Sequence, residues 1–181
     1  MKKDLEFIRD EIRDVPDFPK PGILFKDVTT LFQSPKAMRK VIKILLRRYR
    51  NQEIDVIAGI EARGFIVGAI LANRLGKPFV PIRKKGKLPY RTVSQTYILE
   101  YGTDAIEMHM DAILPGQKVL IVDDLIATGG TALAACLLVE KLGGKVAECN
   151  FIIDLPDLKG SKKLQLQGYS VFSVVDFPGV S

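Results

Sequence analysis

The segment from residue 118 to residue 142 constrains the fold of this chain more than any other. It begins with the apolar run Val119–Val122, continues with Asp123 and Asp124, and passes through a glycine-containing turn into a helical pattern. A buried strand that leads through a short turn into a helix is the repeating unit of parallel α/β sheets. Other strand and helix patterns alternate along the chain. The sequence therefore predicts an α/β fold, with a mainly parallel, twisted sheet and helices on both faces.

The remaining pattern fills in this architecture. It predicts strands at residues 54–58, 78–82, 96–100, 105–110, 118–123, 146–153 and 169–175, and helices at about 5–12, 35–49, 65–75 and 131–142. The two strands that flank Tyr101–Thr103 are expected to form an antiparallel flap, and the basic stretch 83–91 a mobile loop. We found no repeat, so residues 1–181 are interpreted as one domain, in which residues 1–34 form a small N-terminal hood.

Composition narrows the classes of function. The 181 residues contain 27 Lys and Arg against 21 Asp and Glu, and the net charge of +6 favours anionic partners. Two cysteines fit a reducing compartment. The longest apolar run, Phe65–Ala72, is far shorter than the ~18 to 20 residues of a membrane helix, and acidic residues interrupt the N-terminal segment. We therefore expect a soluble, cytoplasmic protein that does not bind a membrane.

The turn after the two aspartates has the composition of a phosphate cradle. Its residues are Ala127, Thr128, Gly129, Gly130 and Thr131. Backbone N–H groups at the start of a helix lack partners, and glycines let the chain curve closely around an oxyanion. The threonine hydroxyls can donate to the same anion. A plain strand-to-helix turn is the alternative, but acids on one side and threonines at both ends of the turn favour a functional site.

Asp123 and Asp124 are neighbours on a predicted strand, so their side chains point to opposite faces. We expect one to face the ligand and the other to orient a neighbouring group or a metal-bound water.

Residues 119–131 resemble the phosphoribosyl-pyrophosphate-binding motif of the purine phosphoribosyltransferases. Three further segments are similar to the adenine-specific branch of that family: FPKPGILFKD at 18–27, GIEARGF at 59–65, and IRKKGKLP at 82–89 together with YILEYG at 97–102. The matches occur in the family's order, from about residue 17 to at least residue 160. The resemblance implies a type I phosphoribosyltransferase fold and a purine-salvage transferase that converts adenine and phosphoribosyl pyrophosphate to AMP and pyrophosphate.

The resemblance also implies a role for each matching position. Ala127 to Thr131 would hold the 5′-phosphate, and Asp123 and Asp124 would lie under the ribose hydroxyls, where carboxylates counter positive charge on the ribose. The implied pyrophosphate site consists of Ala62, Arg63, Arg83 and Lys87. Mg²⁺ would be the cofactor, held mainly by substrate oxygens and water. Loop residues that complete a neighbour's site would require a homodimer.

The base and its proton are assigned in the same way. The implied adenine site consists of Leu24, Phe25, Lys26 and Leu125, with main-chain recognition around Leu24 and Lys26. Glu100 would transfer the proton at the purine nitrogen, and Tyr101 would help to close the lid. Phe25 as an ordinary core aromatic is the alternative interpretation.

Two positions depart from the family pattern. Ala62 stands where relatives often carry serine before the arginine, and residues 107–110 (EMHM) replace more basic and polar residues. Glu61 is interpreted as an exposed turn acid without a role. The run Arg83–Lys87 lacks the interleaved aromatic residues that stack on bases, so we expect no nucleic-acid partner.

Two other functions remain open at this point. One is transfer to a 6-oxo purine such as hypoxanthine, guanine or xanthine. The other is a non-catalytic regulator that senses phosphoribosyl pyrophosphate on the same fold, although the residues before the first sheet strand show no DNA-reading element.

Overall fold

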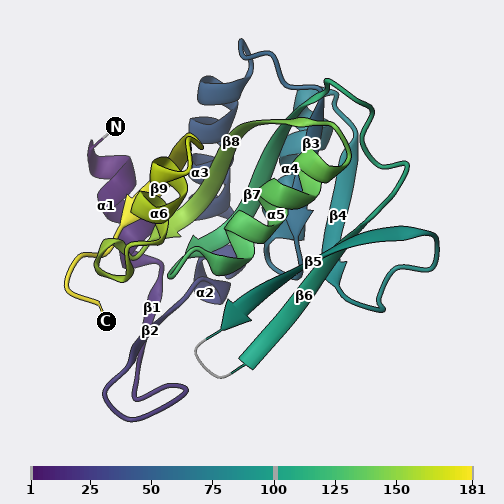
Figure 1. The fold of residues 1–181 in the computed structure, drawn as a ribbon. Coiled ribbons are helices and arrows are strands. Elements are labelled where there is room, and N and C mark those ends of the chain that lie inside the picture. Colours follow the sequence, from purple (N-terminus) through teal and green to yellow (C-terminus); the bar gives the residue numbers. More distant parts are fainter. Residues whose placement is uncertain (1, 100–101, 181) are drawn as a thin grey trace.

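The computed structural model describes residues 2–99 and 102–180. The elements in chain order are α1 (Lys2–Asp10), β1 (Arg13–Pro16), β2 (Leu24–Asp27), α2 (Thr29–Gln33), α3 (Pro35–Tyr49), β3 (Val56–Ile60), α4 (Gly64–Leu75), β4 (Phe79–Lys84), β5 (Thr92–Leu99), β6 (Gly102–His109), β7 (Lys118–Ile126), α5 (Gly130–Lys141), β8 (Lys145–Asp154), the 3-10 turn η1 (Pro156–Leu158), α6 (Gly160–Leu166) and β9 (Val171–Asp176). Figure 1 shows their arrangement.

The described strands form two sheets. One contains β1 and β2, paired antiparallel, and the other has the order β5-β6-β4-β3-β7-β8-β9. The strands from β4 to β9 in that order run parallel, whereas β6 and β5 pair antiparallel at one edge. The predicted mainly parallel α/β sheet with an antiparallel flap is confirmed.

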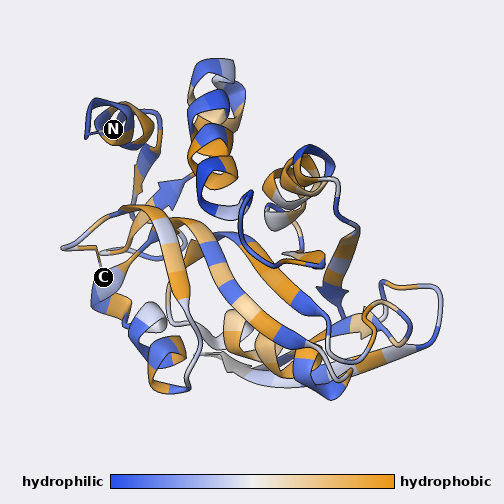
Figure 2. Cartoon of the chain, turned by 90° about the horizontal axis from the view of Figure 1, so that it is seen from above, coloured by the Kyte–Doolittle hydropathy of each residue, from blue (hydrophilic) through white to orange (hydrophobic). Residues whose placement is uncertain are grey.

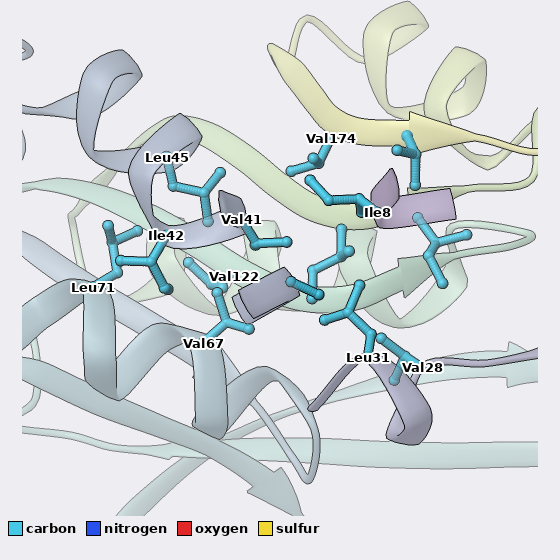
Figure 3. Packing of buried hydrophobic residues seen from close by; sticks show 14 of the residues in the cluster. Ile8, Val28, Leu31, Val41, Ile42, Leu45, Val67, Leu71, Val122 and Val174 are labelled. Atoms are coloured by element: carbon cyan, nitrogen blue, oxygen red, sulfur yellow. The ribbon is translucent and has the colours of Figure 1, made fainter. Parts of the chain in front are cut away.

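Alternation along the central strands gives the large sheet two buried faces. On one face, Val122 packs with residues of α1, α3 and α4, as Figure 3 shows for Ile8, Val41 and Val67. On the other face, Ile121 packs under the apolar side of α5. In the turned view of Figure 2, helices accordingly lie on both sides of the sheet. Because α1 and α3 share one core cluster with β7, the N-terminal segment is packed onto the body of the protein.

Two helix boundaries follow from the sequence as predicted. The hydroxyl of Ser34 accepts a hydrogen bond from the backbone N–H of Ala37 at 3.4 Å, and Pro35 occupies the first position of α3. α4 ends at Leu75, directly before Gly76.

The N-terminal prediction needs correction. The first helix ends at Asp10 rather than continuing towards Pro16, because residues 13–16 pair with β2 as a strand. Ile12 is buried nevertheless, with 6% of its surface exposed. The Pro- and Gly-rich stretch 17–22 therefore lies between the two strands of a hairpin.

Other differences concern the ends of elements. β7 continues to Ile126, so Asp123 and Asp124 lie within the strand and not at its end. β6 ends at His109, and Met110 is 56% exposed although Ile106 and Met108, on its predicted face, are buried. The short helices α2 and α6 were not predicted, since five to seven residues carry too little periodicity.

The carboxyl ends of β3, β4, β7 and β8 meet at one edge of the sheet, which is where ligands bind in folds of this kind. The β1–β2 and β5–β6 hairpins both extend below the sheet in Figure 1, on the side where α5 begins. Within the described ranges, every helix is too short or too polar to cross a membrane.

Candidate active site

The turn from β7 into α5 encloses a small cavity. Its volume is about 190 Å³, and its lining runs from Asp123 through the predicted cradle residues to Ala132. Gly129 precedes the first residue of α5 and has a φ of 74°, a conformation that costs residues with a side chain free energy. The first N–H groups of α5 have no partner within the helix, so this cavity suits an anion.

Gly160 supports the cradle from behind. Its N–H donates to the carbonyl of Ala127 at 3.0 Å. A Cβ at Gly160 would come within 3.0 Å of that carbonyl oxygen and to 2.7 Å from the backbone nitrogen of Gly129. The cradle and the start of α6 are therefore packed backbone against backbone. Sequence analysis did not identify this role of Gly160. A glycine at the start of a helix, where no turn requires one, could have indicated it.

The two aspartates point in different directions, as the alternation of a strand requires. Asp123 lines the cradle cavity, and its carboxylate accepts the backbone N–H of Asp124 at 2.8 Å. Burial, together with the neighbouring charge of Asp124, raises the pKa of Asp123 well above its ordinary value. Asp124 is 5% exposed and accepts a hydrogen bond from Nε of Arg63 at 2.5 Å.

Arg63 belongs to the turn that follows β3, in which the Glu61–Ala62 peptide is cis. Burial opposes the charged form of Arg63, but nearby carboxylates outweigh this effect and raise its pKa. The largest contribution comes from Asp124, and a smaller one comes from Asp27 at the end of β2. The N-terminal hairpin therefore approaches this turn closely enough for its charge to act on Arg63.

Arg83 is held against the same turn. It donates to both carboxylate oxygens of Glu61 at 3.1 Å and to the carbonyl of Lys87 at 3.0 Å. The interpretation of Glu61 as an exposed acid without a role is corrected, because its side chain is 21% exposed and also accepts the N–H of Lys84. The structure thus joins the turn at Ala62 and the basic loop, two segments predicted to hold one pyrophosphate.

The predicted adenine-site residues lie on two elements. Leu24, Phe25 and Lys26 are on β2, and Leu125 is on β7, and Leu24 and Leu125 pack against the same buried cluster. Phe25 is half-buried and lies edge-on to Phe18 at 5.2 Å between ring centroids. Because Phe18 is 50% exposed, this aromatic pair lies near the surface of the hairpin.

Lys26 itself is buried, with 7% of its surface exposed. Its ammonium group pairs with Asp14 and lies 4.3 Å above the ring of Phe177. Its side chain is therefore held between β1 and the segment after β9, which leaves its backbone as the part that can contact a ligand.

Glu100 and Tyr101 lie outside the described residues, so their predicted roles have no structural counterpart here. β5 ends at Leu99 and β6 begins at Gly102 on either side of them.

A larger groove, of about 600 Å³, lies between α3 and α4. It is lined by Met38, Arg39, Ile42, Lys43, Leu46, Arg47, Arg50, Ile70 and Arg74. This groove contains none of the predicted site residues. We therefore place the candidate active site where the carboxyl ends of the strands meet, although the cavity there is smaller.

Comparison with known proteins agrees with this geometry. Residues 27–178 match the family model described as the phosphoribosyl transferase domain. The adenine phosphoribosyltransferase of Chlorobium phaeovibrioides is 58% identical over 174 residues, which cover 95% of this chain and 98% of the relative. The crystal structure of the Rhodothermus marinus adenine phosphoribosyltransferase superposes with a TM-score of 0.91 at 52% identity, covering 98% of this chain and 100% of that one.

The Saccharomyces cerevisiae adenine phosphoribosyltransferase, solved with an imino-altritol bisphosphate and adenine, has a TM-score of 0.89 at 41% identity and covers 97% of this chain and 100% of its own. Family model, sequence relatives and solved structures thus agree over nearly the full length of the chain. The chain belongs to the adenine phosphoribosyltransferase family.

Proposed function

We propose that this protein transfers the phosphoribosyl group of phosphoribosyl pyrophosphate to adenine and releases pyrophosphate. The observation that carries the proposal is the convergence of an anion cradle after β7 with an arginine-bearing turn after β3. Between them lie Asp123 and Asp124. A ribose that carries a phosphate at one end and a pyrophosphate at the other fits this order of groups. A family member solved with adenine supports adenine as the acceptor.

The two anionic ends of the substrate have separate sites in this proposal. Residues Ala127 to Thr131 hold the 5′-phosphate through backbone N–H groups and hydroxyls. Ala62, Arg63, Arg83 and Lys87 hold the pyrophosphate. In the structure Arg63 and Arg83 pair with Asp124 and Glu61, so pyrophosphate shares or replaces these internal partners when it binds.

The aspartates act on the ribose. Their oxygens accept hydrogen bonds from the ribose hydroxyls and stabilise the positive charge that develops as the bond from C1 to pyrophosphate breaks. A new bond then forms between C1 and the purine nitrogen. Glu100 accepts the proton that this nitrogen loses, and returns it in the reverse direction.

The N-terminal hairpin recognises the base. Leu24 and Lys26 are two residues apart on β2, so their backbone groups point to the same edge of a two-stranded sheet. A carbonyl there accepts from the exocyclic amine of adenine, and an N–H donates to a ring nitrogen, while Phe25 and Leu125 contact the ring faces. A 6-oxo purine presents the opposite polarity and leaves these groups unpaired. We propose that the hairpin is part of a small N-terminal hood over the base, which residues 1–34 form within a single domain of residues 1–181.

Mg²⁺ is the proposed cofactor. Nowhere in residues 2–99 and 102–180 do three His, Cys, Asp or Glu side chains come together to hold a metal ion. We propose instead that the ion would be held mainly by oxygens of the substrate and by water, near Asp123 and Asp124. When bound, Mg²⁺ neutralises charge on the leaving pyrophosphate.

A homodimer is also proposed. α4 starts next to Arg63 and leaves Ile66 and Ile70 exposed by 42% and 38%. An apolar surface beside the pyrophosphate turn supports contact with a second copy there. Analytical ultracentrifugation checks this, since a dimer has twice the 20.1 kDa mass of the chain. A reducing, cytoplasmic location is also proposed, because two cysteines in the whole chain are too few for a disulfide-rich scaffold.

A panel of bases tests the reaction. Purified protein is incubated with phosphoribosyl pyrophosphate, with or without Mg²⁺, and with adenine, hypoxanthine, guanine or xanthine, and nucleotides are separated by chromatography. AMP formed from adenine alone is expected. Nucleotide formed from a 6-oxo purine would overturn the assignment of the hood. Binding of phosphoribosyl pyrophosphate without turnover would favour a sensor.

Two variants test the residue roles in the same assay. Glu100→Ala and Lys87→Ala are expected to lower turnover while the fold survives. Lys85→Ala is the matched control, because Lys85 is an exposed lysine of the same loop without an assigned role. Full activity in both variants would show that the site is assigned wrongly.

A further inference from the structure

Glu107 is a buried glutamate that faces the basic loop. It lies on β6 and is 4% exposed. One carboxylate oxygen, Oε1, accepts the backbone N–H groups of both Lys87 and Leu88 at 3.0 Å, and Oε2 accepts the hydroxyl of Thr92 at 3.3 Å. Across the residues that the structure describes, no lysine or arginine forms an ion pair with it. Its direct partners are therefore amides and a hydroxyl, although its charge also acts at longer range on Arg83 and contributes to the raised pKa of that residue.

These contacts keep the carboxylate ionised. Burial alone would raise the pKa of Glu107, but hydrogen bonds from the backbone of Leu88, Gly86 and Lys87 outweigh burial and lower it. A group that is buried, charged and bonded to the successive amides of Lys87 and Leu88 restrains the segment that supplies those amides.

The restrained segment has few other recorded hydrogen bonds: the N–H of Lys85 donates to the carbonyl of Ala105 at 3.0 Å, and the N–H of Lys87 also donates to the carbonyl of Lys84 at 3.2 Å. β4 pairs with β6 at Arg83 and Lys84, and the chain then leaves the sheet until β5 begins at Thr92. Arg83 lies opposite Glu107 in this register and donates to the carbonyl of Lys87. Glu107 therefore accepts a hydrogen bond from the N–H of Lys87, while Arg83 donates one to its carbonyl. Both polar groups of the Lys87 backbone are thus hydrogen-bonded to side chains.

We propose that Glu107 is a positioning residue for pyrophosphate binding, which fixes the backbone of residues 86–88 so that Lys87 and Arg83 reach the ligand together. The proposal rests on the function proposed above. A carboxylate near a pyrophosphate site repels the ligand by charge, so its contribution has to be geometric. Ordering the loop before binding lowers the conformational entropy that binding would otherwise lose.

Three substitutions separate geometry from charge. Glu107→Gln keeps an oxygen that accepts both amides, Glu107→Asp keeps the charge with a shorter reach, and Glu107→Ala removes the acceptor. Glu148→Ala is the matched control, because Glu148 is 6% exposed and is bonded to Arg48 and Tyr49, which belong to α3 and not to the loop.

Calorimetric binding of phosphoribosyl pyrophosphate is the first measurement. Glu107→Ala is expected to weaken binding about tenfold, equal to about 1.4 kcal/mol, while the KM for adenine stays unchanged. Glu107→Gln is expected to bind like the wild type, and Glu107→Asp to fall between them, which keeps the test available if the alanine variant does not fold. Glu148→Ala should lower the melting temperature without changing this affinity. If all three Glu107 variants bound phosphoribosyl pyrophosphate with the same affinity as one another, whether at or below that of the wild type, the proposal would be overturned.

Hydrogen exchange is the second measurement and needs no substrate. The amides of Lys87 and Leu88 are expected to exchange faster in Glu107→Ala than in the wild type or Glu107→Gln. Unchanged exchange would overturn the anchoring role alone. Failure of the wild-type protein to bind phosphoribosyl pyrophosphate, with exchange as expected, would instead overturn the proposed function and, with it, the role in ligand binding.

Discussion

Substituting Gly160 by alanine tests whether the phosphate cradle depends on its support from α6. The φ of Gly160 is one that alanine adopts freely, so the substitution adds a methyl group without backbone strain. That methyl would lie 2.7 Å from the backbone nitrogen of Gly129, where ordinary contact begins at 3.4 Å. The cradle has to move away by about 0.7 Å or more, because backbone atoms cannot rotate aside as a flexible side chain can.

This displacement has two measurable consequences. Overpacking of this kind costs about 1–3 kcal/mol of the free energy of unfolding. Loss of one charge-assisted hydrogen bond to the 5′-phosphate costs about 2 kcal/mol more on binding, or roughly a 30-fold weaker affinity. Both effects follow from the contact of Gly160 with Ala127 and Gly129.

Urea unfolding and calorimetric titration with AMP measure the two effects separately. Gly168→Ala is the matched control, since Gly168 follows the other end of α6 and has open space around it, but has a φ of 89°. It should lose about 1 kcal/mol of stability through backbone strain and keep its affinity for AMP. If Gly160→Ala binds AMP as tightly as the wild type, the cradle does not depend on this contact.

Three further predictions concern charge and stability. Hydrogen bonds from Thr29 and Arg13 lower the pKa of Asp27 to about 2 from 3.8. This shift contributes about 2 kcal/mol to the free energy of unfolding above pH 4, and the contribution is lost as the pH falls towards 2. In Asp27→Asn, the free energy of unfolding measured with urea should therefore change less between pH 4 and pH 2. Arg63→Ala leaves the carboxylate of Asp124 buried without its cation and should cost about 3 kcal/mol, and a double variant that also carries Asp124→Asn should be more stable than Arg63→Ala alone; equal melting temperatures would contradict this. Tyr49→Phe removes a hydroxyl that donates to Glu148 at 2.7 Å and should cost about 2 kcal/mol without changing the KM for phosphoribosyl pyrophosphate.

The architecture could be predicted because its signals are local. An apolar strand followed by a glycine turn and a helix is typical of one arrangement, the strand–turn–helix unit of a parallel α/β sheet. A Ser-Pro pair indicates the start of a helix through hydrogen bonds within a few residues. The turn that lines the cavity after β7 was predictable for the same reason, since the five residues from Ala127 to Thr131 are consecutive; their binding of phosphate stays a prediction. β1 was not, because a four-residue strand that contains a proline becomes visible only through its partner β2.

The support of the site was less predictable, because it depends on pairs far apart in sequence. Glu61 and Arg83 are 22 residues apart, and Arg63 and Asp124 are 61 apart. Glu107 stood out only as a departure from a pattern, and its function depends on the register between β4 and β6. A single sequence shows which residues are charged, but the fold decides which of them meet.

The pairing of Arg63 with Asp124 and of Arg83 with Glu61 gives the resting protein its own counter-ions. Although the chain carries a net charge of +6, these two arginines are already neutralised before a ligand arrives. An incoming anion has to compete with a carboxylate that is tethered beside each arginine, so a singly charged anion gains little by the exchange, whereas pyrophosphate, the ligand proposed above for both arginines, would pair with the two at once. Dissolved salt screens the internal pairs as well as the ligand. Discrimination between anions by their valence is thus built into the unliganded site.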